Sequence, residues 1–196
     1  MKILIVSGFL GAGKTTFIKR LARNVDQRFA ILENEYGAAG IDGARLGQNR
    51  QGTQKNVWEM TEQCICCIGK KDFATSVLTI ANVVDPEYLI VEPTGVGSLA
   101  RIIENLRQIE YERIQLLSPV TIVDVYSYRR YMAEYPELYQ DQIRSADTII
   151  VSKTEACQAE EKQRIQKFLQ EINSQAKIIT DYASTMTRED YQSLLL

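Results

Sequence analysis

The sequence predicts an α/β fold in three layers, in which helices flank both faces of a mostly parallel sheet. Short apolar segments rich in β-branched residues alternate along the chain with longer segments that have helical spacing. Alternation of this kind is typical of parallel sheets whose strands are buried on both faces. Hydrophobic residues make up 45% of the 196 residues, which is enough for one substantial core.

Each element is predicted from its own composition. The run KILIVS at residues 2–7 has the β-branched, apolar character of a buried strand, and a glycine-rich turn follows it directly. Similar apolar runs predict strands at residues 29–34, 56–60, 88–92, 119–124, 147–152 and 176–181. Helical spacing is found at residues 14–24, 71–84, 100–109 and 159–172, followed by a short helix near the carboxyl end. Five glycines among many polar residues predict a loop at residues 35–55.

Composition excludes several classes of partner. The net charge of −2 and the lack of a basic run argue against nucleic acid, and no apolar run approaches the about 20 residues of a membrane span. The amino-terminal run lacks a small-residue cleavage site, so we expect a cytoplasmic protein whose thiols stay reduced. The sequence has no histidine, so its chemistry must use carboxylates, thiols, lysine, backbone amides or a bound ion.

The segment GFLGAGKTT matches the phosphate-binding pattern G-x-x-x-x-G-K-[ST]. Its glycines let the backbone turn so that N–H groups point at phosphate oxygens, and the following helix adds its positive end. We expect Lys14 to reach the β- and γ-phosphates and Thr15 to place its hydroxyl on Mg²⁺. The fold is therefore predicted to be that of the P-loop nucleoside triphosphatases. The candidate nucleotide-binding residues of this segment are Gly8, Gly11, Ala12, Gly13, Lys14, Thr15 and Thr16.

A second group of candidate residues, SKTE, ends the strand predicted at residues 147–152. A carboxylate at Glu155 can accept from guanine N1–H and N2–H₂, which adenine lacks, and Lys153 can pack along the base. Ser152 stands where many GTPases carry asparagine. A plain helix-capping turn is the alternative interpretation of the same residues. We expect Ser152, Lys153 and Glu155 to bind the base, and the nucleotide to be GTP or GDP.

Two acidic segments are candidates for chemistry at the γ-phosphate. In EPTG, Glu92 can hold Mg²⁺ through water or orient the attacking water, and the Gly95 N–H can meet the γ-phosphate. Lys14 and Glu92 are thus the candidate catalytic residues. In ENEYGAAGID, Asp42 is the candidate to bind Mg²⁺ together with Thr15, in a loop that can order around the nucleotide. A solvated surface loop is the alternative for these acidic residues.

Together these motifs resemble one family, the CobW-type GTPases, within the P-loop class that includes the urease and hydrogenase nickel-insertion GTPases. The Cys-x-Cys-Cys motif between the two acidic segments makes the resemblance much more specific, because the phosphate-binding pattern alone is shared by many functions. The matching segments are GFLGAGKTT at residues 8–16, ENEYG with Asp42 at 33–42, CICC at 64–67, EPTG at 92–95, VD at 123–124 and SKTE at 152–155.

The resemblance implies a GTPase whose hydrolysis of GTP to GDP and phosphate is coupled to metal or cofactor insertion into a client metalloprotein. It also implies zinc, or another thiophilic ion, at the Cys-x-Cys-Cys motif, and nucleotide-dependent homodimerisation. We expect slow intrinsic turnover. Three features depart from the family pattern: we expect a single GTPase domain at residues 1–196 without the family's C-terminal domain, histidine is absent, and the base motif is Ser-Lys-Thr-Glu rather than Asn-Lys-x-Asp.

The clustered thiols of Cys64, Cys66 and Cys67 have three interpretations: a metal site, a redox sensor or inert buried side chains. Cysteines this close in sequence rarely form good disulfides with one another. Thiolates suit Zn²⁺ or Cu⁺, and three sulfurs leave one position of a tetrahedral zinc open. We expect a metal site in which Glu35, or a water molecule, completes the coordination. Cys157 stands alone and is expected to be structural.

Two other functions are compatible with the motifs. An ATP-using small-molecule kinase of the P-loop class would need an arginine-rich lid, for which YRRY at residues 128–131 is the one paired-arginine segment. A non-catalytic metal or redox sensor would keep the nucleotide fold with negligible turnover. Tight GDP binding without ATP affinity would exclude the kinase, and measurable turnover would exclude the sensor.

Overall fold

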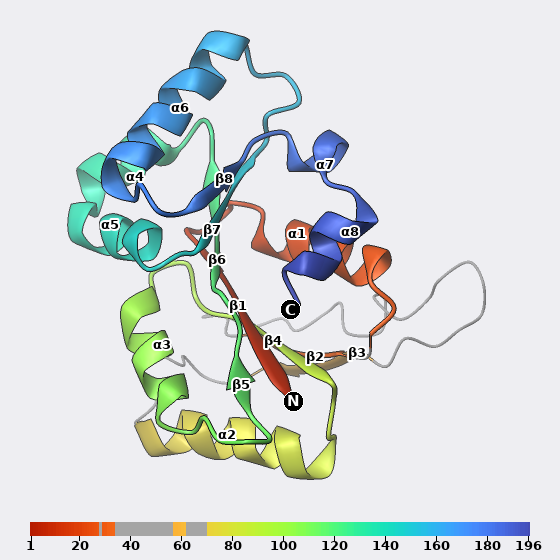
Figure 1. The fold of residues 1–196 in the computed structure, drawn as a ribbon. Coiled ribbons are helices and arrows are strands. Elements are labelled where there is room, and N and C mark those ends of the chain that lie inside the picture. The colour runs from red at the N-terminus through yellow and green to blue at the C-terminus, as the bar shows by residue number, and fades with distance from the viewer. Residues whose placement is uncertain (28, 34–56, 62–69) are drawn as a thin grey trace.

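A central sheet of parallel strands organises the chain. The computed structural model describes residues 1–27, 29–33, 57–61 and 70–196 (Figure 1). The strands in these ranges are β1 (Lys2–Gly8), β2 (Phe29–Glu33), β3 (Val57–Thr61), β4 (Tyr88–Glu92), β5 (Gln115–Leu116), β6 (Val120–Asp124), β7 (Thr148–Ser152) and β8 (Lys177–Ile179). Their order across the sheet is β3-β2-β4-β1-β6-β7-β8, with β5 beside β1, and all of these pairings are parallel. The predicted sheet is confirmed.

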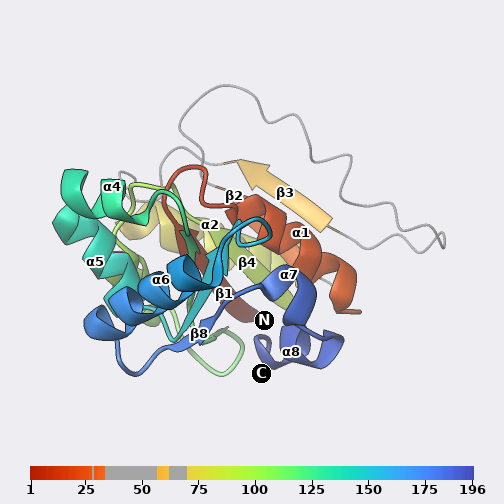
Figure 2. The same cartoon turned by 90° about the horizontal axis from the view of Figure 1, so that it is seen from above.

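Helices cover both faces of this sheet (Figure 2). In the described residues they are α1 (Lys14–Asn24), α2 (Lys70–Val83), α3 (Leu99–Arg107), α4 (Tyr128–Glu134), α5 (Pro136–Arg144), α6 (Ala159–Ile172), α7 (Tyr182–Thr185) and α8 (Arg188–Ser193). Local sequence does not predict α4 and α5, because their buried side chains include two tyrosines and a glutamine and because α5 begins at a proline. Pro136 is tolerated since it is the first residue of α5, where its missing N–H breaks no helical hydrogen bond.

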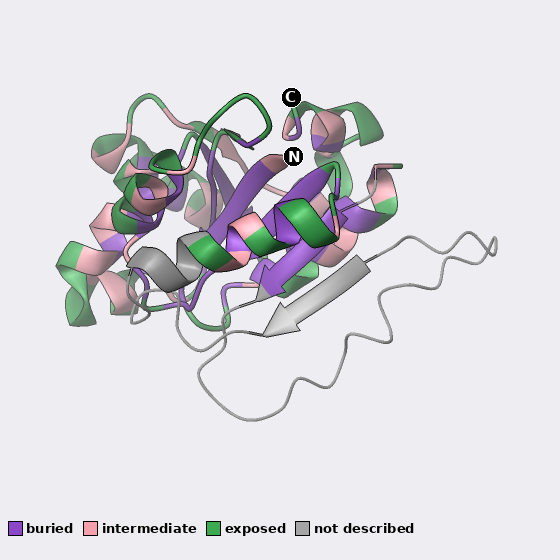
Figure 3. Ribbon diagram, turned by 90° about the horizontal axis from the view of Figure 1, so that it is seen from below, coloured by how far each residue is buried: buried purple, intermediate pink, exposed green. Residues whose placement is uncertain are grey.

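The sheet divides the core into two parts. Along β1, Ile3 and Ile5 pack into one part while Leu4 and Val6 pack into the other, as the two-residue period of a strand requires. The first part includes buried residues of α2, α3, α4, α5 and α6, and the second includes those of α1, α7 and α8. Figure 3 shows buried strands between helices whose outer faces are exposed. The three-layer prediction is therefore confirmed.

Strand register brings the predicted site residues to one edge of the sheet. In parallel strands the carboxyl ends lie together, and ligands of such sheets bind there. Asp124 at the end of β6 is paired with Ser152 at the end of β7, while Glu92 at the end of β4 is paired with Glu33. Between them, Gly8 ends β1. Within the described ranges, every helix is too short or too polar to span a membrane.

Candidate functional site

The turn between β1 and α1 has the backbone shape of a phosphate cradle. The backbone φ angles of Gly8, Gly11 and Gly13 are 143°, 70° and 100°, which residues other than glycine rarely adopt. A Cβ on Gly8 would lie 2.5 Å from the carbonyl oxygen of Ile122 on β6. Gly13 is the N-cap of α1, so the turn ends at the positive end of that helix. Of the other candidates in the turn, Ala12 is buried, whereas Thr16 is exposed.

Lys14, Thr15 and Glu92 come together from α1 and β4. The Thr15 hydroxyl donates to the Glu92 carboxylate, with Oγ1 3.1 Å from Oε1 and 3.2 Å from Oε2. The Lys14 ammonium lies 4.0 Å from Glu92 Oε1 and donates to the Phe9 carbonyl at 3.5 Å. Lys14 and Glu92 are both buried, and opposite charges compensate one another there. Sequence reasoning placed these residues at one edge, and the structure brings them into contact.

The charges and ligand atoms of Lys14, Thr15 and Glu92 fit Mg²⁺ and phosphate. Mg²⁺ prefers oxygen ligands, and the hydroxyl of Thr15 and the carboxylate of Glu92 already lie within hydrogen-bond distance of each other. Lys14 supplies a buried positive charge beside them. These residues therefore suit a magnesium–phosphate pair in charge and in donor type. Asp42, the other predicted magnesium ligand, lies outside the described residues.

The loop after β4 packs directly against the turn between β1 and α1, residues 8–13, which is the candidate phosphate-binding turn. A Cβ on Gly95 would lie 2.4 Å from the backbone nitrogen of Leu10 and 2.9 Å from the carbonyl carbon of Phe9, so only glycine fits without a shift. The Gly97 N–H donates to the Thr94 carbonyl at 3.0 Å, which closes the loop before α3. The structure thus places Gly95 beside the turn. The sequence predicts that the N–H of this glycine meets the γ-phosphate.

The base motif begins inside the core. Ser152 is buried, and its hydroxyl donates to the carbonyl oxygen of Ala12 at 2.6 Å. The serine that stands in place of asparagine therefore holds the phosphate-binding turn. Lys153 and Glu155 follow in the loop after β7 and are exposed. Lys153 has a positive φ of 61°, which marks a sharp turn of the backbone directly after the strand.

An ion pair fixes the lysine of the base motif. Lys153 Nζ lies 2.7 Å from Asp124 Oδ2 at the end of β6. Asp124 also accepts hydrogen bonds from the Tyr126 N–H at 2.8 Å and the Ser127 hydroxyl at 2.9 Å. Burial opposes the ionisation of Asp124, but the hydrogen bonds from Lys153, Tyr126 and Ser127 outweigh it, so the pKa of this carboxyl lies below its ordinary value. The VD pair of the sequence thus supplies an anchor for Lys153.

Aromatic residues of α4 and α5 hold the phosphate-binding turn, a role that sequence reasoning missed. The Phe9 ring lies 4.6 Å from that of Tyr131 and 5.0 Å from that of Tyr139, measured between centroids. The Tyr131 hydroxyl also donates to the Leu10 carbonyl at 3.0 Å. Burial raises the pKa of the Tyr139 hydroxyl far above its ordinary value, so it stays neutral. The only sequence signal was the clustering of tyrosines after Asp124.

The paired arginines considered for a kinase lid are engaged in other contacts. Arg129 lies 3.2 Å from Glu161 Oε1 of α6 and donates to the Tyr128 hydroxyl at 2.9 Å. Arg130 lies over the ring of Tyr131 at 4.7 Å. Both side chains therefore serve the packing of α4 in this structure.

The predicted thiolate site falls outside the part of the chain that is described. Its candidate ligands there are Glu35, Cys64, Cys66 and Cys67. Cys157 is a free, half-buried thiol after β7, 3.6 Å from the Gln158 carbonyl. Within the described ranges, no three histidine, cysteine, aspartate or glutamate side chains are grouped to hold a metal ion.

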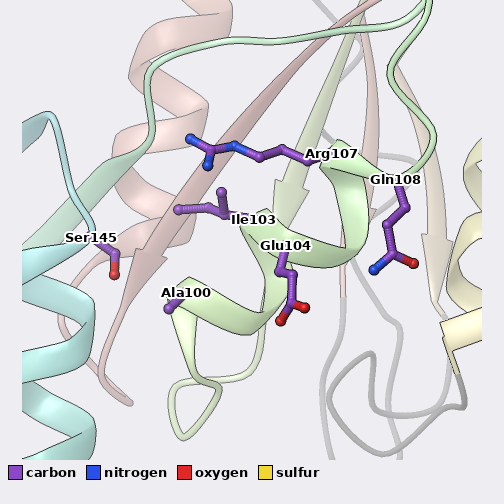
Figure 4. A pocket seen from close by; sticks show the side chains of 6 residues that line it. All are labelled: Ala100, Ile103, Glu104, Arg107, Gln108 and Ser145. Atoms are coloured by element: carbon purple, nitrogen blue, oxygen red, sulfur yellow. The ribbon is translucent and has the colours of Figure 1, made fainter.

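A separate surface pocket of about 520 Å³ lies along α3 (Figure 4). None of its lining residues belongs to the phosphate-binding turn, the loop before α3 or the base motif. The lining residues are Ala100, Ile103, Glu104, Arg107, Gln108 and Ser145.

Comparison with known proteins decides the family. The family model described as "CobW/HypB/UreG, nucleotide-binding domain" matches residues 2–180. The chain belongs to this family. It is 30% identical to the zinc chaperone YeiR of Escherichia coli, over 89% of this chain and 53% of YeiR. It is 27% identical to the zinc chaperone CobW of Pseudomonas aeruginosa, over 91% of this chain and 56% of that protein.

Solved structures confirm the fold of this CobW/HypB/UreG family member. The Zn(II)-bound YjiA GTPase of Escherichia coli matches all of this chain and 61% of its own, with a TM-score of 0.71 and 21% identity. The hydrogenase maturation factor HypB of Archaeoglobus fulgidus matches with a TM-score of 0.67 and 17% identity, over 100% of this chain and 88% of that one. The chain spans about half the length of the curated relatives named above.

Proposed function

We propose that this chain is a Mg²⁺-dependent GTPase that hydrolyses GTP to GDP and phosphate and couples the reaction to binding of a zinc-type ion for a client metalloprotein. The observation that carries the nucleotide half is the contact of Thr15 with Glu92, 3.1 Å apart, beside a glycine turn and a buried Lys14. The zinc half is supported by the Cys-x-Cys-Cys motif and by the names of the relatives, which are zinc chaperones.

The residues divide the work of phosphoryl transfer, which is largely positioning and electrostatic stabilisation. The glycine turn and the start of α1 bind the phosphates, and Lys14 offsets their charge. Mg²⁺, when bound, neutralises charge on the phosphate oxygens, and Thr15 and Glu92 would hold it. The hydrogen bond from Thr15 favours this role for Glu92 over the orientation of water. The Gly95 N–H would donate to the γ-phosphate.

Recognition of guanine is assigned to the loop after β7. Asp124 keeps Lys153 beside the site, so that its alkyl stem can lie along the base. The exposed carboxylate of Glu155 would accept from guanine N1–H and N2–H₂. Ser152 contributes through the phosphate-binding turn, whose Ala12 carbonyl it holds.

The metal half of the proposal uses the three clustered thiols and Glu35. Three thiolates would hold zinc, and Glu35 or a water molecule would take the fourth position, at which the ion could pass to a client. We further propose slow intrinsic turnover, a nucleotide-dependent homodimer, a single GTPase domain at residues 1–196 and a cytoplasmic location. Each of these rests on the sequence and on the family.

One experiment tests both halves on the same sample. Metal analysis and titration with GDP and ATP are carried out on the anaerobically purified chain, with about one zinc per chain expected. Changing Cys66 and Cys67 together to serine should abolish zinc binding, while Cys157→Ser is the matched control and should retain it. Unchanged zinc in the double variant would contradict the metal half, and ATP affinity equal to that of GDP would contradict the choice of base.

A further inference from the structure

The loop after β4 is held from its other side by one buried glutamine. Gln142 of α5 is 1% exposed, and its Nε2 donates to the carbonyls of Gly95 at 3.2 Å and Gly97 at 2.9 Å. The backbone carbonyl of Gln142 accepts from the Thr121 hydroxyl at 2.9 Å. The side chain of this residue therefore joins α5 to the loop, whereas its backbone joins α5 to β6.

The side-chain oxygen of Gln142 supports a specific role for the hydrogen bonds that its nitrogen donates to the loop. Its Oε1 is buried and has no hydrogen-bond partner among the described residues. An unpaired buried acceptor opposes folding, and an apolar side chain of the same size would avoid that cost. Turning the amide over would place Oε1 against the two glycine carbonyls, so the donor is committed to the loop.

These contacts determine which way the loop N–H groups point. In a trans peptide the C=O and the following N–H point in opposite directions. Gln142 donates to the carbonyl of Gly97, and the N–H of the same glycine donates to the Thr94 carbonyl at 3.0 Å. The Thr94 carbonyl shares its peptide plane with the Gly95 N–H. The direction of that N–H is thus set by a short chain of contacts that begins at Gln142.

The loop is also confined on the side of the phosphate-binding turn. A Cβ on Gly95 would lie 2.4 Å from the Leu10 nitrogen, so the two backbones are in direct contact. The same helix that carries Gln142 carries Tyr139, which packs on Phe9 of the turn at 5.0 Å. Helix α5 therefore contacts both sides of the phosphate site and keeps them in register.

We propose that Gln142 is a positioning residue of the nucleotide site, which holds the loop at residues 93–98 against the phosphate-binding turn and directs the Gly95 N–H. Its effect on hydrolysis rests on the proposed GTPase function, whereas its hold on the loop does not. Gln142 touches neither nucleotide nor metal in this scheme, since it acts through the backbone of Gly95 and Gly97.

The test compares two substitutions that each remove one kind of contact made by Gln142: its side-chain bonds to the loop, or its backbone bond to Thr121 of β6. Gln142→Met keeps the length and volume of the side chain but removes both donated hydrogen bonds. Thr121→Val removes the bond to the Gln142 backbone and leaves the amide intact, so it is the matched control. The measurements are hydrogen exchange of the loop peptide at residues 93–98, kcat for GTP and affinity for GDP.

We expect loop amides in Gln142→Met to exchange about tenfold faster and kcat to fall about tenfold, since two hydrogen bonds that orient the loop are lost. GDP affinity should stay within about twofold, because GDP has no γ-phosphate for Gly95 to contact. Thr121→Val should match the unaltered chain in all three measurements.

Unchanged loop exchange in Gln142→Met, or an equal change in Thr121→Val, overturns the proposal. If Gln142→Met does not fold, as judged by circular dichroism, Gln142→Glu takes its place, because it keeps the shape and turns an acceptor toward the glycine carbonyls. If the unaltered chain hydrolyses no GTP, the proposed function fails, while hydrogen exchange still decides whether Gln142 holds the loop.

Discussion

Replacement of Gly95 by alanine tests the close contact between the loop after β4 and the phosphate-binding turn. The added Cβ would lie 2.4 Å from the Leu10 nitrogen and 2.9 Å from the Phe9 carbonyl carbon. These are backbone atoms, which cannot swing aside as the end of a side chain can. Overpacking of this kind costs about 1–3 kcal/mol, and displacement of the Gly95 carbonyl from Gln142 adds about 1 kcal/mol. We therefore expect a loss of about 3 kcal/mol in the free energy of unfolding.

Gly11→Ala supplies the control, because it adds the same methyl group in the same region without a clash. A Cβ on Gly11 would meet nothing within 4 Å, but its φ of 70° is unfavourable for alanine. That conformation costs about 1–2 kcal/mol, part of which is offset because alanine also restricts the unfolded chain. The expected net loss for Gly11→Ala is about 1 kcal/mol.

Urea unfolding followed by circular dichroism separates the two outcomes. With a denaturant slope near 3 kcal/mol per molar, Gly95→Ala should lower the midpoint by about 1 M and Gly11→Ala by about 0.3 M. The same losses correspond to falls in melting temperature of about 6–12 °C and about 2–4 °C. Equal shifts for the two variants would refute the argument, since backbone contact at Gly95 would then contribute nothing.

Three further outcomes follow from the site. Glu92→Gln keeps the size of the side chain but removes its charge, so GTP turnover should fall about 100-fold in a phosphate-release assay. Ser152→Ala removes the bond to Ala12 and should weaken GDP binding about fivefold by calorimetry. Asp124→Asn should cost about 1 kcal/mol at pH 7, discounted because Lys153 is half exposed. The pKa of folded Asp124 lies below its ordinary value, so this stabilisation is full above about pH 4 and is lost as pH falls through the folded pKa. Urea unfolding of the unaltered chain and of Asp124→Asn should therefore show a smaller difference in unfolding free energy at pH 3 than at pH 7.

Much of the fold could be predicted because its strands are buried on both faces. Every residue of β4, β6 and β7 is buried, and each of these strands is a nearly continuous apolar run in the sequence. Helices α4 and α5 lack such a signal. Their inward side chains include Tyr128, Tyr139 and Gln142, which carry polar groups and become buried through contacts distant in sequence.

The site shows the same division between local and distant signals. The glycine turn, Lys14 and Thr15 were predicted because a local pattern specifies their geometry. The contact between Thr15 and Glu92 spans 77 positions and was predicted only as a shared edge of the sheet. The hold of Gln142 on Gly95 and Gly97 was not predicted, because backbone carbonyls accept hydrogen bonds whatever side chain their residue carries.

The central position of β1 has a consequence for how the chain folds. On one side of this first strand, Lys2–Ile5 pair with Tyr88–Val91 of β4. On its other side, Val6–Gly8 pair with Val120–Ile122 of β6. During synthesis neither partner exists when β1 emerges, so the glycine turn cannot close before Ile122 has been made. Pairings this distant in sequence are formed slowly. Affinity for nucleotide should therefore arise late in refolding. The rate at which nucleotide binding appears would then report the rate at which β1 becomes paired on both sides.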